Sequence, residues 1–320
     1  MRHLMWLLLL PLALAQAAEV PDTAFSEHAV TLERPGGTLY GTELVPEVDG
    51  KVPVVLLHPG SGPTDRDGNS TQLPGHNNSL RMVAEALARR GIASVRYDKR
   101  MIGASVSPAW KEADIRFDDF VGDLLAWVPQ LRADPRFARL VLVGHSEGAL
   151  IVTAACTRSG ADGCVSIAGI ARPFADVLTE QVAPRLTPEL LAQNQRILAL
   201  LKQGKAAPDV PPELAPLYRP SVQPYLISLM RYDPAALTAA LTTPLLILQG
   251  TSDIQVPVRE AQALAAADAR ARLVIVDGMN HVMKLVGTDP ALQQRSYSSP
   301  DLPVAPQLMD ALADFVAGLR

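Results

Sequence analysis

The stretch LVLVGHSEGAL, residues 140–150, decides the fold of this chain. Its apolar first half predicts a buried strand, and residues 147–155 predict the start of a buried helix. Ser146 therefore lies on the turn from a strand into a helix. Gly144 and Gly148 suit such a turn, because the strand and helix backbones come close and leave no room for a Cβ. We expect this turn to present the Ser146 hydroxyl to a neighbouring base; a buried structural serine is the alternative.

The length and charge of the chain narrow its class. Its 320 residues suit one large α/β domain, residues 18–320, with an inserted subdomain. The formal net charge of −4 comes with no basic run, which argues against nucleic-acid binding and against docking on an anionic membrane. The expected partner is a small, mildly polar or apolar molecule, and the oligomeric state is left open.

The N-terminus has the pattern of a signal peptide. Residues 1–3 carry charge, residues 4–15 are apolar, and Ala15-Gln16-Ala17 provides a small-x-small cleavage site. A signal peptide is therefore predicted at residues 1–17, and its removal predicts an exported protein, periplasmic or secreted. The apolar segment is short for a membrane span, and no later apolar run is long enough to cross a bilayer. An uncleaved N-terminal anchor is the alternative.

The chain has two cysteines, Cys156 and Cys164. An exported protein meets oxidising conditions, in which a disulfide can form. The segment between the two cysteines reads as a turn that folds the end of a helix back to the next strand, so a bridge is geometrically possible. Two small buried thiols are the alternative, and the sequence leaves both readings open.

Strands and helices alternate through most of the chain. An antiparallel hairpin is predicted around the turn Pro35-Gly36-Gly37. The later predicted strands are residues 52–58, 92–98, 140–143, 164–170, 244–250 and 272–276, and the predicted helices are residues 80–91, 117–131, 147–155, 258–267 and 308–319. This order predicts an α/β fold, with a mostly parallel central sheet and helices on both of its faces.

The alternation stops between about residues 171 and 243. This stretch is punctuated by prolines and rich in helix-forming residues, but it has no strand pattern. Its many apolar positions disfavour a disordered linker. We interpret it as a helical cap inserted over the carboxyl edge of the sheet. Such a cap would gate a site at that edge and set the length of the ligand chain that the site prefers. Its candidate pocket-lining residues are Tyr225, Leu229 and Met230.

Two loops follow the last predicted strands. Asp253 comes after residues 244–250, and His281 comes after residues 272–276. Because parallel strands end at one edge of a sheet, these residues can converge there with Ser146. An imidazole can take the serine proton, and a carboxylate can hold the imidazole in the right tautomer and stabilise its charged form. Ser146, Asp253 and His281 are therefore the predicted catalytic residues.

The acid and the base each have rivals. Asp253 could instead only cap the segment that follows it, and Asp277 is a second acid near His281. Among the other histidines, His58 is expected to order packing or a loop rather than act as the base. His145 is expected to point away from the turn at the serine, by strand alternation.

Attack on a carbonyl creates an oxyanion, which needs preorganised backbone donors. Glu147, the residue after the serine, offers one N–H at the positive end of its helix. The glycine-rich loop after residues 52–58 is the expected source of the second, because glycines let the backbone approach closely. Ser61 is the predicted donor there, with Gly60 as the next choice; a plain glycine turn is the alternative.

Four segments together carry a resemblance to a known family: residues 60–69, 144–148, 249–253 and 280–284. They resemble the α/β-hydrolase superfamily, and more narrowly its bacterial carboxylesterases, often grouped with the serine aminopeptidase-like hydrolases. The likeness spans nearly the whole mature chain. A further loop, residues 97–105, matches the family as well, although Met101 stands where the family usually has glycine.

The resemblance implies a cofactor-free esterase that cleaves carboxylic esters of small to medium acyl groups through an acyl-enzyme intermediate. A peptidase or thioesterase that uses the same three residues is the alternative. An alternative of another class is a non-catalytic binding protein on the same fold. The sequence has no paired-histidine or Cys-His spacing, so it predicts no metal site.

Overall fold

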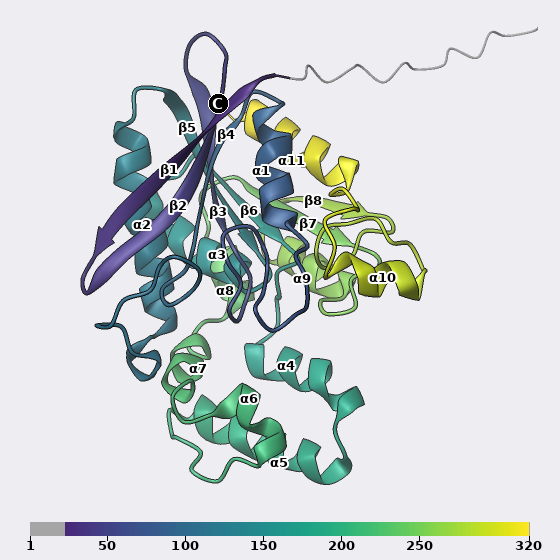
Figure 1. Cartoon of the computed structure of the whole chain (residues 1–320). Coiled ribbons are helices and arrows are strands. Elements are labelled where there is room, and N and C mark those ends of the chain that lie inside the picture. Colours follow the sequence, from purple (N-terminus) through teal and green to yellow (C-terminus); the bar gives the residue numbers. More distant parts are fainter. Residues whose placement is uncertain (1–22, 320) are drawn as a thin grey trace, which may run out of the picture.

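The computed structural model describes residues 23–319, so the predicted signal peptide at residues 1–17 lies outside the described residues. Within the described part, an eight-stranded sheet forms the centre of the molecule (Figure 1). The strands are β1 (Phe25–Arg34), β2 (Gly37–Pro46), β3 (Val52–His58), β4 (Ala93–Tyr97), β5 (Phe137–His145), β6 (Gly163–Ile167), β7 (Leu245–Gly250) and β8 (Arg272–Val276). They lie in the order β1-β2-β4-β3-β5-β6-β7-β8.

The sheet is mostly parallel. β1 and β2 form the predicted antiparallel hairpin, and β2 also pairs antiparallel with β4. All pairs from β4 to β8 are parallel. The carboxyl ends of six strands therefore meet at one edge, and the predicted α/β fold is confirmed.

Helices cover both faces of the sheet. The helices are α1 (Ser79–Ala88), α2 (Phe117–Ala133), α3 (Glu147–Ser159), α4 (Phe174–Val182), α5 (Pro188–Lys202), α6 (Ala215–Tyr218), α7 (Gln223–Leu229), α8 (Pro234–Ala239), α9 (Val258–Ala267), α10 (Pro290–Ser296) and α11 (Pro306–Gly318). Buried side chains of α2, α3 and α9 pack on one face, and those of α1 and α11 pack on the other. Within the helix-rich insertion the sequence singled out α5 and α7 but not α4, α6 or α8, and it did not predict α10 either.

The period of two along the central strands builds both cores. Leu56 and Leu142 face the core that includes α2 and α3, whereas their neighbours Leu57 and Val143 face the core that includes α1 and α11. Successive side chains of a strand point to opposite faces. A strand covered on both sides must therefore be apolar throughout, which is why β3 and β5 read as continuous apolar runs.

The crossover between β6 and β7 holds the helices α4 to α8. In Figure 1, α4 to α7 form a lobe beyond one end of the sheet. Glu260 of α9 fixes the start of this helical insertion, because its carboxylate accepts hydrogen bonds from the backbone N–H groups of Ala171 and Arg172, at 2.9 and 3.1 Å. Buried side chains such as Ile197 and Leu201 join the insertion to the core.

Cys156 and Cys164 form a disulfide. The sequence had left open whether they are bridged or are two buried thiols. The bridge joins the last turn of α3 to β6, with 6.5 Å between the two Cα atoms. Both cysteines are buried. None of the described helices is long and apolar enough to cross a membrane.

Candidate active site

Ser146 stands at the joint between β5 and α3, with φ 57° and ψ −121°. Residues with a side chain rarely adopt this backbone conformation, which costs on the order of 1–3 kcal/mol. A Cβ at Gly144 would overlap the Gly148 carbonyl group, and a Cβ at Gly148 would lie 2.5 Å from the Pro59 carbonyl oxygen and 2.6 Å from that of His58. Glycine is therefore required on both sides of the serine, as the sequence indicated.

Asp253 and His281 lie in contact at the ends of β7 and β8. His281 Nδ1 donates a hydrogen bond to Asp253 Oδ2 at 2.8 Å, and both side chains are buried. The other carboxylate oxygen, Oδ1, accepts from the backbone N–H groups of Gln255 and Val256 at 2.8 and 2.9 Å. The loop-capping role and the contact with histidine, which the sequence posed as alternatives for Asp253, thus occur together.

The electrostatic surroundings keep the Asp253 carboxylate ionised. Burial alone would raise its pKa, but the interaction with His281 and the two backbone hydrogen bonds outweigh burial, and the net pKa is lowered. Because Nδ1 of His281 donates to this carboxylate, the neutral ring has its acceptor nitrogen at Nε2. An ionised acid and an imidazole of this tautomer are what proton transfer from a serine needs.

The rival acid, Asp277, points elsewhere. Its Oδ1 accepts a hydrogen bond from Thr251 Oγ1 at 2.9 Å, and the Thr251 hydroxyl oxygen accepts in turn from Gly278 N–H at 2.8 Å. Asp277 therefore joins the loop after β8, which carries His281, to the loop after β7, which carries Asp253. The structure pairs His281 with Asp253.

His145 contacts His281, and the expectation that it points away from the site is wrong. Its Nε2 donates to the carbonyl oxygen of His281 at 2.7 Å, and the two rings lie 4.9 Å apart. The alternation argument failed because the histidine loop folds back over the end of β5. His145 thereby joins the loop of the base to the residue before Ser146, although the Ser146 hydroxyl itself makes no hydrogen bond to a described residue.

Gly60 lies against the serine from the loop after β3. A Cβ at Gly60 would be 3.2 Å from the Ser146 Cβ and 3.4 Å from His145 Nδ1. The backbone N–H groups of Ser61 and Glu147 donate no hydrogen bond to any described residue. Both predicted oxyanion donors are therefore free of described partners, and Ser61 follows a residue with little more than the space of a hydrogen atom between it and the serine.

Two ion pairs hold the glycine-rich loop to the end of β4. Asp98 accepts from the Arg66 backbone N–H and from its guanidinium, each at 2.8 Å. Arg96 Nε donates to Asp67 Oδ1 at 2.7 Å. Asp98 also accepts from the neighbouring loop, in which Met101 has a φ of 66°. This left-handed conformation explains why glycine suits the position that Met101 occupies.

Tyr225 of α7 brings the helical insertion to the residue after the serine. Its ring lies 5.6 Å from that of Phe120, edge to face. Its hydroxyl is buried and forms no hydrogen bond of ordinary geometry with a described residue. Burial, and secondarily the nearby Glu147 carboxylate, raise the pKa of Tyr225 well above its ordinary value. Of the three predicted pocket residues, Tyr225 therefore lies beside Glu147. Leu229 is only 1 % exposed and belongs to the hydrophobic core, and Met230 packs against that core.

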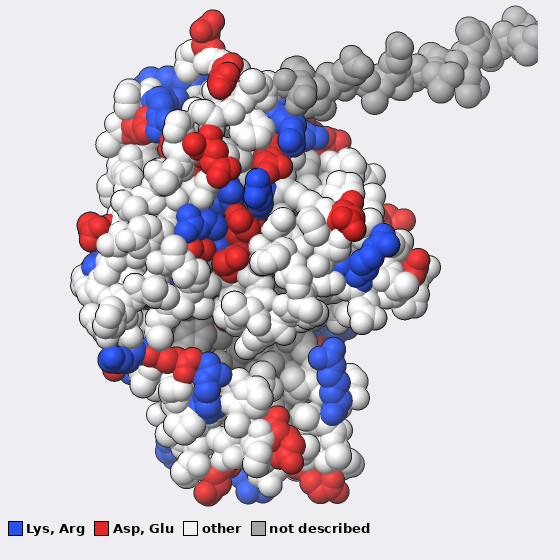
Figure 2. Space-filling model, viewed as in Figure 1, with Lys and Arg blue, Asp and Glu red and all other residues white. Residues whose placement is uncertain are grey.

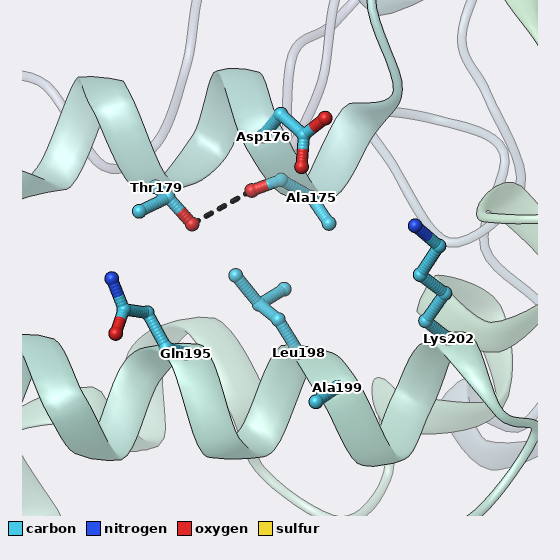
Figure 3. A pocket seen from close by; sticks show the side chains of 7 residues that line it. All are labelled: Ala175, Asp176, Thr179, Gln195, Leu198, Ala199 and Lys202. Atoms are coloured by element: carbon cyan, nitrogen blue, oxygen red, sulfur yellow. Dashed lines mark hydrogen bonds between the residues drawn. The ribbon is translucent and has the colours of Figure 1, made fainter.

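A hollow of about 430 Å³ lies within the insertion, between α4 and α5 (Figure 3). It is lined by Ala175, Asp176, Thr179, Gln195, Leu198, Ala199 and Lys202. The Thr179 hydroxyl is already hydrogen-bonded to the Ala175 carbonyl oxygen at 2.8 Å, and none of the predicted site residues lines this hollow.

Positive and negative side chains are mixed over the face shown in Figure 2, without an extended patch of either sign. The described residues contain no group of three or more acidic, histidine or cysteine side chains that could hold a metal.

A family model described as serine aminopeptidase, S33, matches residues 73–285, about two thirds of the chain. This match covers the turn from β5 into α3 at Ser146, called the elbow below, and the loops that carry Asp253 and His281. The chain belongs to the serine aminopeptidase (S33) family of α/β hydrolases. The membership predicted from the four motifs is thereby confirmed.

The chain is also similar to individual known proteins, one in sequence and two in fold. Esterase EstD from Thermotoga maritima is 30% identical over 272 residues, which cover 83% of this chain and 63% of EstD. The chain thus spans less than two thirds of the length of that relative. Two solved structures share the fold. Est1E from Butyrivibrio proteoclasticus, with ferulic acid bound, has a TM-score of 0.60, 18% identity and coverage of 91% and 99% of the two chains. The hypothetical protein PA2218 from Pseudomonas aeruginosa has a TM-score of 0.63, 17% identity and coverage of 97% and 100%.

Two residues of this α/β-hydrolase site escaped the sequence analysis. His145 was assigned to the wrong side, and Lys99, which lies within the motif loop of residues 97–105 just after β4, was given no role. A polar residue at the end of an apolar strand was the available signal for both, since a sheet edge is where such a side chain can reach a neighbouring loop.

The buried histidines predict how stability depends on pH. Burial lowers the pKa of His145 to about 3 and that of His58 well below its ordinary value; His281 beside His145 and Lys99 beside His58 act in the same direction. Between about pH 3 and the unfolded value of about 6.5, the unfolded chain binds the proton that the folded chain refuses, so stability falls as the pH falls.

His145→Gln should therefore reduce the slope of unfolding free energy against pH by about 1.4 kcal/mol per pH unit between pH 4.5 and 6. Glutamine retains a side-chain N–H for the His281 carbonyl group. Urea unfolding at a series of pH values measures the slope. His76→Gln is the control, because His76 is exposed in the folded protein. Equal slopes for wild type and His145→Gln would contradict a neutral His145.

Proposed function

We propose that this α/β hydrolase cleaves carboxylic esters of small to medium acyl groups, through a covalent acyl-enzyme on Ser146. The observation that carries the proposal is the 2.8 Å hydrogen bond from His281 to the buried Asp253, beside a serine held at a strained elbow. The name of the relative EstD supports an ester as the substrate. The free N–H groups of Ser61 and Glu147 supply the place for the oxyanion.

In the proposed first step, Ser146 Oγ attacks the ester carbonyl carbon while His281 Nε2 accepts the hydroxyl proton. The carbonyl oxygen gains the electron pair and becomes an oxyanion, which the N–H groups of Ser61 and Glu147 stabilise. Asp253 stabilises the imidazolium that has formed. The carbon–oxygen bond to the alcohol then breaks, and His281 returns the proton to the departing alcohol.

In the second step, water attacks the acyl-enzyme. His281 takes a proton from the water, and a second oxyanion forms in the same place. As this oxyanion collapses, the bond between the acyl carbon and Ser146 Oγ breaks, His281 returns the proton to Ser146 Oγ, and the carboxylic acid is released. Each step needs the serine, the imidazole and the oxyanion donors together. No cofactor or metal enters the proposed reaction.

A peptidase or a thioesterase would use the same three residues, because all three reactions pass through an acyl-enzyme. The esterase name of EstD favours the ester. A binding protein on the same fold would have no use for an ionised acid hydrogen-bonded to a histidine beside a strained serine. Reaction with a fluorophosphonate separates an enzyme of any of these kinds from a binding protein.

Replacement of the proposed catalytic residues should abolish turnover of chromogenic esters. Ser146→Ala and His281→Ala should each lower kcat by several orders of magnitude, and the double variant should be scarcely worse than either, because the residues act as one unit. Asp253→Asn should also be severe, since an amide can select the wrong imidazole tautomer and cannot stabilise the cation. Ser146→Ala should also prevent labelling by a fluorophosphonate.

Asp277→Asn is the matched control for the acid. Asp277 contacts Thr251 rather than His281, so the amide should leave kcat within a few-fold of the wild type. A larger loss for Asp277→Asn than for Asp253→Asn would refute the proposed assignment. Near wild-type turnover by Ser146→Ala would refute the mechanism itself.

We propose further that the helical insertion acts as a cap that limits the acyl chain, with Tyr225 as its main contact. Tyr225→Ala should enlarge the space beside Glu147 and raise the kcat/KM ratio of eight-carbon to four-carbon p-nitrophenyl esters several-fold; one methylene in an apolar pocket is worth about 1–3 kcal/mol. Tyr232→Ala is the control, because its ring packs on Phe117 and its hydroxyl bonds Asp118. If both variants have the same preference between the eight-carbon and four-carbon esters, the insertion does not set the acyl-chain preference.

Export remains a proposal, based on the leader pattern and supported by the Cys156–Cys164 bridge, because structural disulfides persist mainly in oxidising compartments. Protein purified from its native host should begin near Ala18 or Glu19, and neither cysteine should react with iodoacetamide after unfolding without reductant. Mass spectrometry tests both points. Soluble protein that retains residues 1–15, with two reactive thiols, would contradict export.

A further inference from the structure

Lys99 is a buried cation that has no role in the proposed mechanism. It lies two residues beyond the end of β4 and is 2 % exposed. Its Nζ donates to the Gly60 carbonyl oxygen at 2.5 Å and to the Gly62 carbonyl oxygen at 2.9 Å. The lysine therefore clamps the glycine-rich loop on both sides of Ser61.

The first of these contacts reaches the proposed oxyanion donor through one peptide group. The carbonyl of Gly60 and the N–H of Ser61 belong to the same peptide unit, and no described peptide bond is cis. In a planar trans peptide the two groups point in opposite directions. Holding the carbonyl oxygen on Lys99 consequently fixes the direction of the Ser61 N–H, which donates to no described residue.

We propose that Lys99 is a positioning residue, which orients and polarises the Gly60–Ser61 peptide so that the Ser61 N–H is ready to bind the oxyanion formed on Ser146. This inference rests on the proposed serine-hydrolase function. A charged donor on the carbonyl group withdraws electron density and makes the N–H of the same peptide a stronger donor, as in a chain of hydrogen bonds. The two ion pairs from Arg96 and Asp98 hold the rest of the loop, but neither reaches this peptide.

The surroundings of Lys99 allow it to carry charge at neutral pH. Burial lowers its pKa to about 8, and the carboxylate of Glu147 acts in the opposite direction. Nζ also lies 5.7 Å from the centre of the Phe120 ring, at a distance where a cation is attracted to the aromatic face. Glu147 thus acts on Lys99, and an experiment must separate the loss of the lysine from the effect of leaving this carboxylate without its cation.

Lys99→Met removes the donors and the charge at similar length. We expect kcat for a p-nitrophenyl ester to fall about 10- to 100-fold with KM within about threefold, less than the 10²–10³-fold loss that follows removal of an oxyanion donor. The preference for the ester over the matching thionoester should also fall about tenfold, because sulfur is a weak acceptor and gains little from a well-aligned N–H. A purely structural lysine would not change this preference.

Two further variants test the cause of the loss. In Lys99→Met/Glu147→Gln no carboxylate is left without its cation, so the loss should persist if the peptide is what matters. Lys284→Met is the matched control for a buried lysine: Lys284 is also fully buried and its Nζ donates to two carbonyl oxygens, of Asn77 and Ser299, at 2.7 and 2.8 Å. Its loss should lower the melting temperature without changing the ester preference.

Wild-type kcat and ester preference in Lys99→Met would overturn the inference, and so would full recovery in the double variant. If Lys99→Met does not fold, Lys99→Gln, which retains a neutral donor, should show a smaller loss in the same direction; unchanged preference in that variant would also overturn the inference. Fluorophosphonate labelling of Ser146 in the wild type is measured alongside. Its absence would refute the proposed function, and the inference with it, whereas its presence assigns any negative result to Lys99 alone.

Discussion

The close approach of two backbones at the end of β5 is the constraint on which the site depends. Gly144 and Gly148 have no space for a Cβ, and Ser146 between them is held at a positive φ, which residues with a side chain rarely adopt. Such strain persists only where the surroundings determine the geometry, and here the apolar cores on both faces of β5 and α3 do so. Packing energy distributed over the sheet is thus used to keep one hydroxyl at the carboxyl edge.

The loops at that edge are braced against each other rather than attached singly to their strands. His145 beside the serine holds the carbonyl group of His281, whose ring is held by Asp253. On the other side, the end of β4 holds the glycine-rich loop through Asp98 and Lys99. Each contact joins the loops of different strands, so the geometry of the site is a property of the whole edge. This bracing prepares the groups before substrate arrives, which is what electrostatic catalysis requires.

Burial sets the charge states of the site. His58 and His145 remain neutral because desolvation disfavours their cations, so His281, next to an ionised Asp253, is the imidazole in a position to accept a proton. On the side of the insertion, Glu147 lies close to Lys99 and to the Tyr225 hydroxyl, both of which are buried. The insertion therefore brings a polar group, the Tyr225 hydroxyl, close to the residue that follows the serine.

The sequence by itself determined the alternation of strands and helices outside the insertion and the turn at Ser146, and it predicted that Asp253 and His281 lie at the same edge as Ser146, because these follow from local periodicity, from glycine sterics and from the rule that parallel strands end at one edge. Tertiary structure alone decided that Cys156 and Cys164 are bridged, that His145 turns toward His281, and that Lys99 holds the Gly60–Ser61 peptide. These outcomes depend on where loops from distant strands fold back on one another. Such positions are set by the summed packing of the sheet edge, which no local pattern of residues records.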